Sequence, residues 1–95
     1  MDTGSLISDE HALVVAAKAG AKKTVAVLLN RGVDINAHDK FYGNALQRAC
    51  EGGYMDVVEL LLDRGADANQ ESLPYGLPSF AAAFRGHLHI LRLLV

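Results

Sequence analysis

Apolar residues recur at helical spacing in short blocks of this chain, and glycines separate the blocks. Val57, Val58 and residues 60–62 form one apolar face, since residues three and four apart lie on the same side of a helix. This pattern predicts a helix from about Met55 to the Arg64-Gly65 pair. A shorter helix is predicted before it.

The shorter helix is expected from Ala45 to Glu51. Asn44 is well placed to cap it, because an asparagine side chain accepts hydrogen bonds from the free amides of the first turn. The Gly52-Gly53 pair ends it, since glycine readily adopts the left-handed conformation that closes helices. The same pattern predicts helices over residues 12–18 and 22–30.

The chain repeats itself with an offset of 33 residues. Aligning residues 8–40 with 41–73 gives 11 identical pairs in 33, against about two for unrelated segments of ordinary composition. A third copy starts at residue 74 and is incomplete at Val95. Each copy therefore represents one structural unit, and stacked units of this length form open-ended solenoids.

The segments 32–43 and 65–76 are too long to be simple helix connections. Each has an Asp-x-Asn sequence at its base and glycine or proline near its top, which predicts extended, hairpin-like fingers. Small residues recur on the first helix of each unit, at 16–17, 49–50 and 82–83. They allow neighbouring helix pairs to stack closely.

The period, the helix–turn–helix–finger order and the sequence of residues 56–69 resemble ankyrin repeats. Gly86-His87 is similar to the pair that opens the inter-helix turn in that family. The resemblance covers residues 8–95 and implies an all-α ankyrin solenoid forming a single domain over 1–95. Its repeats would span about 8–40, 41–73 and 74–95, the last one incomplete.

Three departures from the family pattern affect the first helices. The Thr-Pro-Leu-His motif is replaced by residues 44–47, where Asn44 serves as the cap and Gln47 as the hydrogen-bonding partner. In the third unit the motif becomes residues 77–80, which lack the usual cap, so Ser79 is predicted to cap that helix instead. The divergent residues 11–14 are typical of an end repeat. Residues 42–47 are similar to a variant of fungal ankyrin arrays, some attached to NACHT-type signalling ATPases.

Composition narrows the class of protein. The 95 residues carry a net charge of −2, so no basic footprint for nucleic acid exists. No apolar run approaches the roughly 20 residues of a membrane helix, and the first residues do not form a signal peptide. With a single cysteine, the chain fits a reducing, intracellular setting, cytoplasmic or nuclear.

Few residues suggest catalysis. Cys50 aligns with Ala17 and is expected in the core as an inert thiol. His87 and His89 are the only close histidine pair, and they lack the further ligands that a zinc site needs. The carboxylates of Asp56, Glu59 and Asp63 share the solvated face of a helix. We therefore expect no enzyme activity, no metal, no cofactor and no small-molecule substrate.

Two sets of residues are candidates for binding a protein partner. On the fingers they are Lys40, Phe41, Tyr42 and Tyr75, although the aromatic rings could instead pack finger against finger. On the first helices the family resemblance implies a concave surface containing Lys18, Arg48, Glu51, Phe84 and Arg85. Aromatic and arginine anchors of this kind are common at protein interfaces.

The sequence predicts a non-catalytic protein-binding module that presents its fingers and concave helix face. The alternative is a ligand-sensing or regulatory segment of a larger signalling protein, such as a NACHT-type ATPase, or of an enzyme. A small metalloenzyme would rest on His87 and His89 alone. Because the third unit is apolar, we also expect further repeats or a capping helix after Val95, or association through this end.

The two glycines of the second unit are expected to differ. Gly53 recurs as Gly20 and Gly86, whereas Gly52 aligns with Ala19 and Arg85. Gly53 alone is therefore predicted to require glycine.

Overall fold

The computed structural model describes residues 8–39, 42–72 and 76–95. Within these ranges the chain forms six helices and one short hairpin. Their bounds are α1 (Asp9–Ala19), α2 (Lys22–Asn30), β1 (His38–Asp39), β2 (Gly43–Asn44), α3 (Ala45–Gly52), α4 (Met55–Asp63), α5 (Pro78–Phe84) and α6 (Leu88–Leu94). The predicted all-α solenoid is confirmed.

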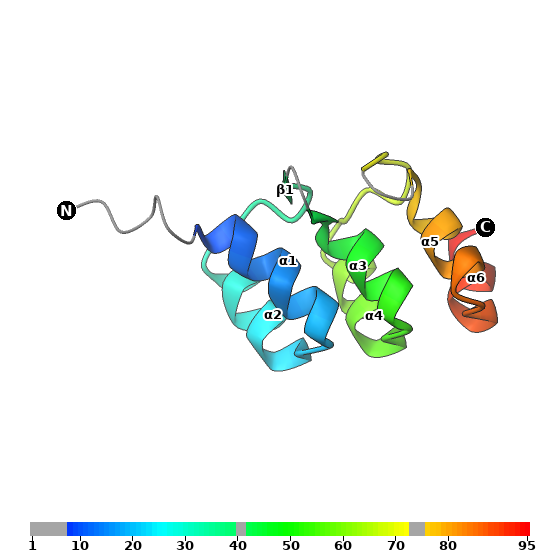
Figure 1. Ribbon diagram of the computed structural model, residues 1–95. Coiled ribbons are helices and arrows are strands. Elements are labelled where there is room, and N and C mark those ends of the chain that lie inside the picture. Colours follow the sequence, from blue (N-terminus) through cyan, green and yellow to red (C-terminus); the bar gives the residue numbers. More distant parts are fainter. Residues whose placement is uncertain (1–7, 40–41, 73–75) are drawn as a thin grey trace.

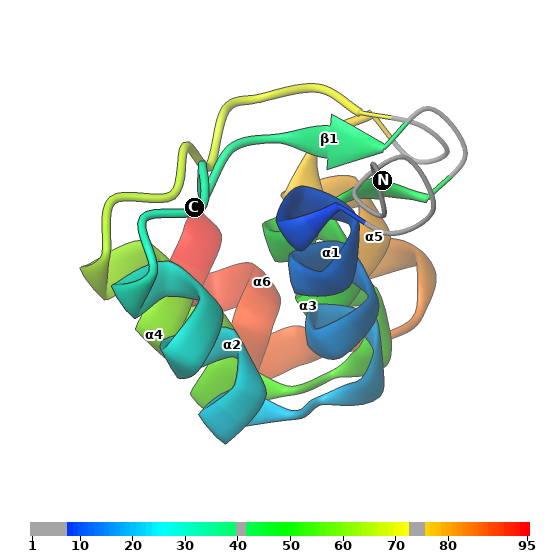
Figure 2. The ribbon, with the colours of Figure 1, turned by 90° about the vertical axis from the view of Figure 1, so that its left-hand side faces the viewer.

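The helices are arranged as three antiparallel pairs stacked along one axis (Figure 1). α3 packs between α1 and α5, and these three form a first-helix layer, while α4 packs between α2 and α6 in a second-helix layer. Viewed along the stack, the long loops leave the second-helix layer and cross toward the first-helix layer (Figure 2). The first-helix layer and the loops therefore frame one side of the molecule.

Two helices, α3 and α1, begin directly after a polar residue whose side chain caps them. The Asn44 side chain accepts a hydrogen bond from the Gln47 amide at 2.7 Å, as predicted for the α3 cap. Ser8 caps α1 in the same way, by accepting from the His11 amide at 3.0 Å. Because of this cap, α1 begins at Asp9, three residues before the predicted start.

The prediction that Ser79 caps the third first-helix is wrong. α5 begins at Pro78, and Leu77 occupies the cap position in an extended conformation. Proline suits the first helical position because its fixed φ is helical and its missing N–H has no partner there anyway. Pro78 therefore starts the helix one residue before Ser79 could cap it.

Both fingers are held at their bases by backbone pairing. In the first, β1 and β2 pair antiparallel, with His38 opposite Asn44. In the second, Ser72 and Gly76 exchange two backbone hydrogen bonds of 2.7 and 2.8 Å. Gln47 Nε2 donates to both carbonyl oxygens of this bridge, at 2.5 and 3.1 Å. Gln47 is thus the predicted hydrogen-bonding partner, and it ties α3 to the second finger.

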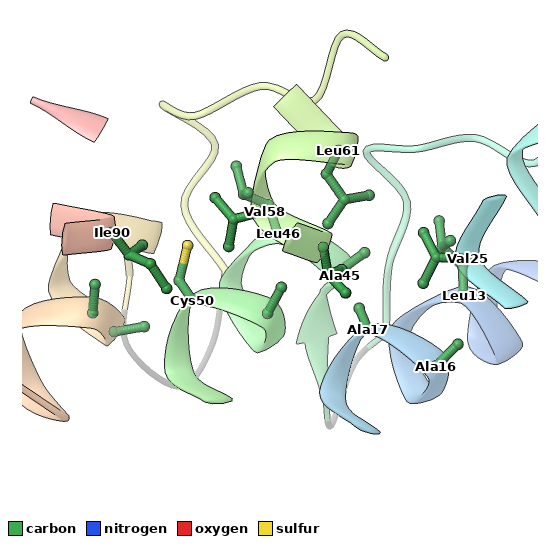
Figure 3. Close-up of a cluster of buried hydrophobic side chains, with 14 of the residues drawn as sticks. Leu13, Ala16, Ala17, Val25, Ala45, Leu46, Cys50, Val58, Leu61 and Ile90 are labelled. Atoms are coloured by element: carbon green, nitrogen blue, oxygen red, sulfur yellow. The ribbon is translucent and has the colours of Figure 1, made fainter. Parts of the chain in front are cut away.

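One continuous apolar core runs through all three pairs (Figure 3). Its buried members include Leu13, Val25, Leu46, Val57 and Leu61. The small first-helix residues allow the close stacking, as predicted: Ala17, Ala49, Cys50 and Ala82 are all buried completely or nearly so.

The third pair exposes the most apolar surface among the described residues. Large apolar side chains at least 44% exposed occur there at Phe80, Phe84, Leu88, Leu93 and Val95. Ala83 aligns with Ala17 and Cys50 but is exposed, because no further helix pair covers it. No helix in the described ranges has the length and hydrophobicity needed to cross a membrane.

Candidate functional site

A groove of about 700 Å³ crosses the first-helix layer at its C-terminal end. It is lined by Lys18, Arg48, Glu51, Gly52, Tyr54, Phe84, Arg85 and His87. Lys18, Glu51 and Phe84 are one 33-residue period apart, so each of the three pairs contributes the same position. The repeat therefore produces a surface that extends across the whole stack.

The lining of the groove includes Gly52, which has no side chain. The ring of Tyr54 lies against this glycine, so a Cβ at Gly52 would be 2.4 Å from Tyr54 Cε2. A side chain at Gly52 would therefore have to displace the Tyr54 ring, which the sequence did not indicate. The same ring also lies over Gly20, where a Cβ would be 2.6 Å from it.

Arg48 differs from its predicted place. It was expected on the accessible concave face, but only 8% of its surface is exposed. Its Nε donates to the Tyr42 carbonyl oxygen, and one terminal nitrogen lies 2.5 Å from Glu51 Oε1. A guanidinium has several donors in a fixed fork, so one arginine can join a finger to a helix. Arg48 thus fixes the groove wall.

The other cations of the groove are accessible. Lys18 and Arg85 are both exposed, and they come from opposite ends of the first-helix layer. Phe84 lies beside Arg85 and is 70% exposed. The groove therefore offers two accessible positive charges and one large apolar surface.

The first finger adjoins the Lys18 end of the groove. Lys18 Nζ lies 5.7 Å from the centre of the Tyr42 ring, within the range of a cation–π contact. The His11 ring meets the same tyrosine edge-on at 5.5 Å, and His11 Nδ1 is 2.7 Å from Asp39 Oδ2. A second hollow of about 200 Å³ lies here, lined by His11, Val14, Val15, Lys18 and Tyr42.

The structure brings most of the predicted surface residues together. Lys18, Arg48, Glu51, Phe84 and Arg85 all line the groove, and Tyr42 stands beside it. Lys40, Phe41 and Tyr75 lie outside the described residues.

Tyr54 and His11 were not foreseen as surface-forming residues. Tyr54 could have been found from its alignment with His87. For His11 no sequence signal exists, because its partner Asp39 is 28 residues away.

Two of the residues considered for chemistry, Cys50 and His87, have structural roles. Cys50 is fully buried, and burial raises the pKa of its thiol to about 12. His87 Nε2 donates to the Glu51 carbonyl oxygen at 2.8 Å, so this side chain ties the turn before α6 to α3. His89 and the carboxylates of Asp56, Glu59 and Asp63 are exposed. No group of three or more potential metal ligands occurs among the described residues.

The chain matches a known protein family. A family description of ankyrin repeats in three copies matches residues 2–72, well over half of the chain. The matched residues include α1 to α4, and the pair α5–α6 beyond them repeats the same geometry. No curated protein matches the sequence.

Proposed function

Because the chain belongs to the ankyrin-repeat family, we propose that it is a non-catalytic protein-binding module whose partner lies in the groove and against the first finger. Ankyrin repeats are generally protein-interaction modules and are typically non-catalytic. The partner and the surface it uses are the parts that we propose for this chain.

One observation carries the proposal. The groove of about 700 Å³ is continuous over three helix pairs and ends at a phenylalanine that is 70% exposed. Exposed aromatic side chains beside arginine are typical anchors of protein interfaces. On the second-helix layer, the exposed face of α4 instead presents the carboxylates of Asp56, Glu59 and Asp63, without an apolar anchor.

The supports of the groove favour binding without rearrangement. Gln47 holds the second finger, and Arg48 joins α3 to the Tyr42 carbonyl of the first. A surface already held in one conformation loses less entropy when a partner binds. We therefore expect a partner to dock onto a preformed surface. A binding role for Lys40, Phe41 and Tyr75 stays a prediction from the sequence.

The cysteine gives no support to a catalytic role. A nucleophilic cysteine acts as a thiolate in an accessible, electropositive site. The Cys50 thiol is buried, and its pKa is raised to about 12, so it stays protonated at physiological pH.

The experiment is affinity capture with matched surface variants. Partners retained by the wild-type chain are identified by mass spectrometry and compared with those retained by Phe84→Ala and Phe80→Ala. Both phenylalanines lie on α5 and are exposed, 70% and 58%, but only Phe84 lines the groove. A specific partner should be lost with Phe84→Ala and kept with Phe80→Ala.

The outer face provides the opposing test. A double variant, Glu59→Ala with Asp63→Ala, changes exposed residues of the second-helix layer. If the partner is lost with this variant and kept with Phe84→Ala, binding occurs on the other side of the molecule and the proposal is wrong.

A further inference from the structure

The charge of the groove is opposite to the charge of the chain. The whole sequence carries a net charge of −2. Three cationic side chains line the groove, Lys18, Arg48 and Arg85, together with a single carboxylate, that of Glu51. Counted over these lysine, arginine and glutamate side chains, the lining has a formal surplus of positive charge.

The one carboxylate of the lining is already engaged. Arg48 lies 2.5 Å from Glu51 Oε1, and both side chains are largely buried. This pair neutralises itself, so a ligand meets chiefly Lys18 and Arg85. Both of these are exposed.

The remaining carboxylates of the described residues lie elsewhere. They occur at the start of α1 (Asp9, Glu10), along the fingers (Asp34, Asp39, Asp67, Glu71) and on the outer face of α4 (Asp56, Glu59, Asp63). A basic groove on an acidic molecule attracts an acidic partner and repels a basic one, which gives specificity more than raw affinity.

The positions of the cations set the length of the ligand. Lys18 belongs to α1, and Arg85 follows α5, two helices further along the layer. Packed helices lie 8–10 Å apart and an extended chain rises about 3.3 Å per residue, so five or six extended residues would span roughly 16–20 Å. Phe84 places an apolar contact at the Arg85 end.

Resting on the proposed function, we infer that the groove binds an extended acidic peptide segment of a partner protein. The segment carries two acidic positions about five residues apart, one for Lys18 and one for Arg85. An apolar side chain next to the second acidic position packs on Phe84. A nucleic acid fits less well, because two accessible cations on a chain of net charge −2 offer little to a phosphate backbone.

The test uses a random library of 16-residue peptides displayed on phage and selected on the immobilised full chain. Enriched peptides are expected to contain two acidic positions four to six residues apart and an aromatic or aliphatic residue beside one of them. Synthetic copies of these peptides, labelled with fluorescein, then give dissociation constants by fluorescence polarisation. Raising the salt from 50 to 500 mM should weaken binding several-fold, since accessible charge pairs are screened.

A matched pair of variants assigns the charges. Lys18→Glu with Arg85→Glu should weaken binding about tenfold or more. Lys22→Glu with Arg92→Glu changes the net charge equally at exposed positions outside the groove, and should change binding less than twofold. Thermal melts of both variants check that they fold.

Three results would overturn the inference. Enriched peptides that are uncharged or basic would show that acidity is not recognised, and the absence of any enriched peptide would show that no linear segment is bound. Tighter binding of a 12-nucleotide single-stranded RNA than of the acidic peptides would assign the groove to nucleic acid. The proposed function fails separately, when a captured partner is insensitive to Phe84→Ala.

Discussion

The turns before α4 and α6 have the same backbone conformation, but different side chains hold them in place. Gly53 and Gly86 end the first helices with φ of +79° and +76°. The residue that follows is Tyr54 in one turn and His87 in the other. Tyr54 lays its ring over Gly20 of the preceding turn, whereas His87 covers Gly53 and donates a hydrogen bond to the Glu51 carbonyl oxygen. Each ring therefore locks its helix pair onto the previous one.

The difference explains the double glycine of the second pair. The tyrosine ring also lies against its own Gly52, so that position has no room for a side chain. The histidine turn has Arg85 at the equivalent position, and this arginine is exposed in the groove. The tyrosine turn therefore has glycine at this position of the groove lining, and the histidine turn has a cation.

The largest effect is expected from Gly53→Val. A β-branched residue with positive φ costs of order 1–3 kcal/mol, and the added Cβ would lie 2.6 Å from His87 Cε1. Displacing His87 also loses its hydrogen bond, worth about 1 kcal/mol. We expect a total loss of roughly 3 kcal/mol in the free energy of unfolding, measured by urea titration.

Gly86→Val is the matched control for this change. Gly86 has the same backbone conformation, but an added Cβ would meet no atom of the described residues within 4 Å. It should therefore lose only the backbone term, of order 1–3 kcal/mol. Equal losses at the two positions would show that the His87 ring contributes nothing to the lock.

The second prediction tests whether the Tyr54 ring is the reason for glycine at position 52. Gly52→Ala forces the Tyr54 ring aside, and overpacking of this kind costs about 1–3 kcal/mol. Replacing glycine by alanine within a helix gains about 1 kcal/mol. The net result in the wild-type chain should be a loss of roughly 1 kcal/mol.

In a Tyr54→His background the same Gly52→Ala change should become neutral or stabilising. A histidine turn accepts a side chain at this position, as Arg85 shows. A double-mutant cycle by urea titration should therefore give a coupling energy of about 1 kcal/mol. A coupling near zero would mean that the Tyr54 ring does not dictate glycine at position 52.

The third prediction separates ring packing from hydrogen bonding. His87→Phe keeps a ring over Gly53 but removes the bond to the Glu51 carbonyl oxygen, which is 2.8 Å long. The loss should be about 1 kcal/mol. Tyr54→Phe keeps its ring as well and serves as the control, with an expected change within about 0.5 kcal/mol. If a urea or thermal melt showed a larger loss of stability for Tyr54→Phe than for His87→Phe, the hydroxyl group of the tyrosine, and not the hydrogen bond of His87, would be the important one.

These turns also show which features of the structure can be predicted from the sequence and which cannot. The offset of 33 residues was enough to predict the helix pairs, the fingers and the row Lys18, Glu51 and Phe84. It could not predict that the Tyr54 ring excludes a side chain at Gly52, because alignment compares positions and not the volumes of neighbouring rings. Nor could it show that Arg48 is buried, since this depends on its bond to Tyr42.

The start of α5 was missed for a local reason. Serine is a common helix cap, so Ser79 was a sound expectation from residue type. Proline at position 78 took precedence, because it is already in helical conformation and needs no hydrogen-bond partner. Pro78 and Ser79 are both residue-type signals for a helix start, and residue type alone does not say which of two adjacent signals prevails.

The smallest effect concerns the reactivity of the Cys50 thiol. This reactivity depends on the contacts by which His87 holds the third helix pair against the second. Cys50 is fully buried, and so is Ala17, whereas the equivalent Ala83 in the last pair is exposed. Burial at this position therefore comes from the next helix pair, which for Cys50 is α5–α6. The thiol should react only when that pair detaches or the chain unfolds.

Burial raises the Cys50 pKa from 9.0 to about 12, so the native chain holds its thiol proton at a pH where the unfolded chain has lost it. Stability should accordingly fall as the pH rises above about 9.

At pH 8 the native thiol should resist a disulfide reagent such as DTNB, and the slow labelling that remains measures opening of the last pair. His87→Phe, by weakening the lock by about 1 kcal/mol, should speed labelling about fivefold, while Tyr54→Phe should leave the rate unchanged. Rapid labelling of the wild-type chain, or equal rates in both variants, would show that His87 does not hold the third pair over Cys50.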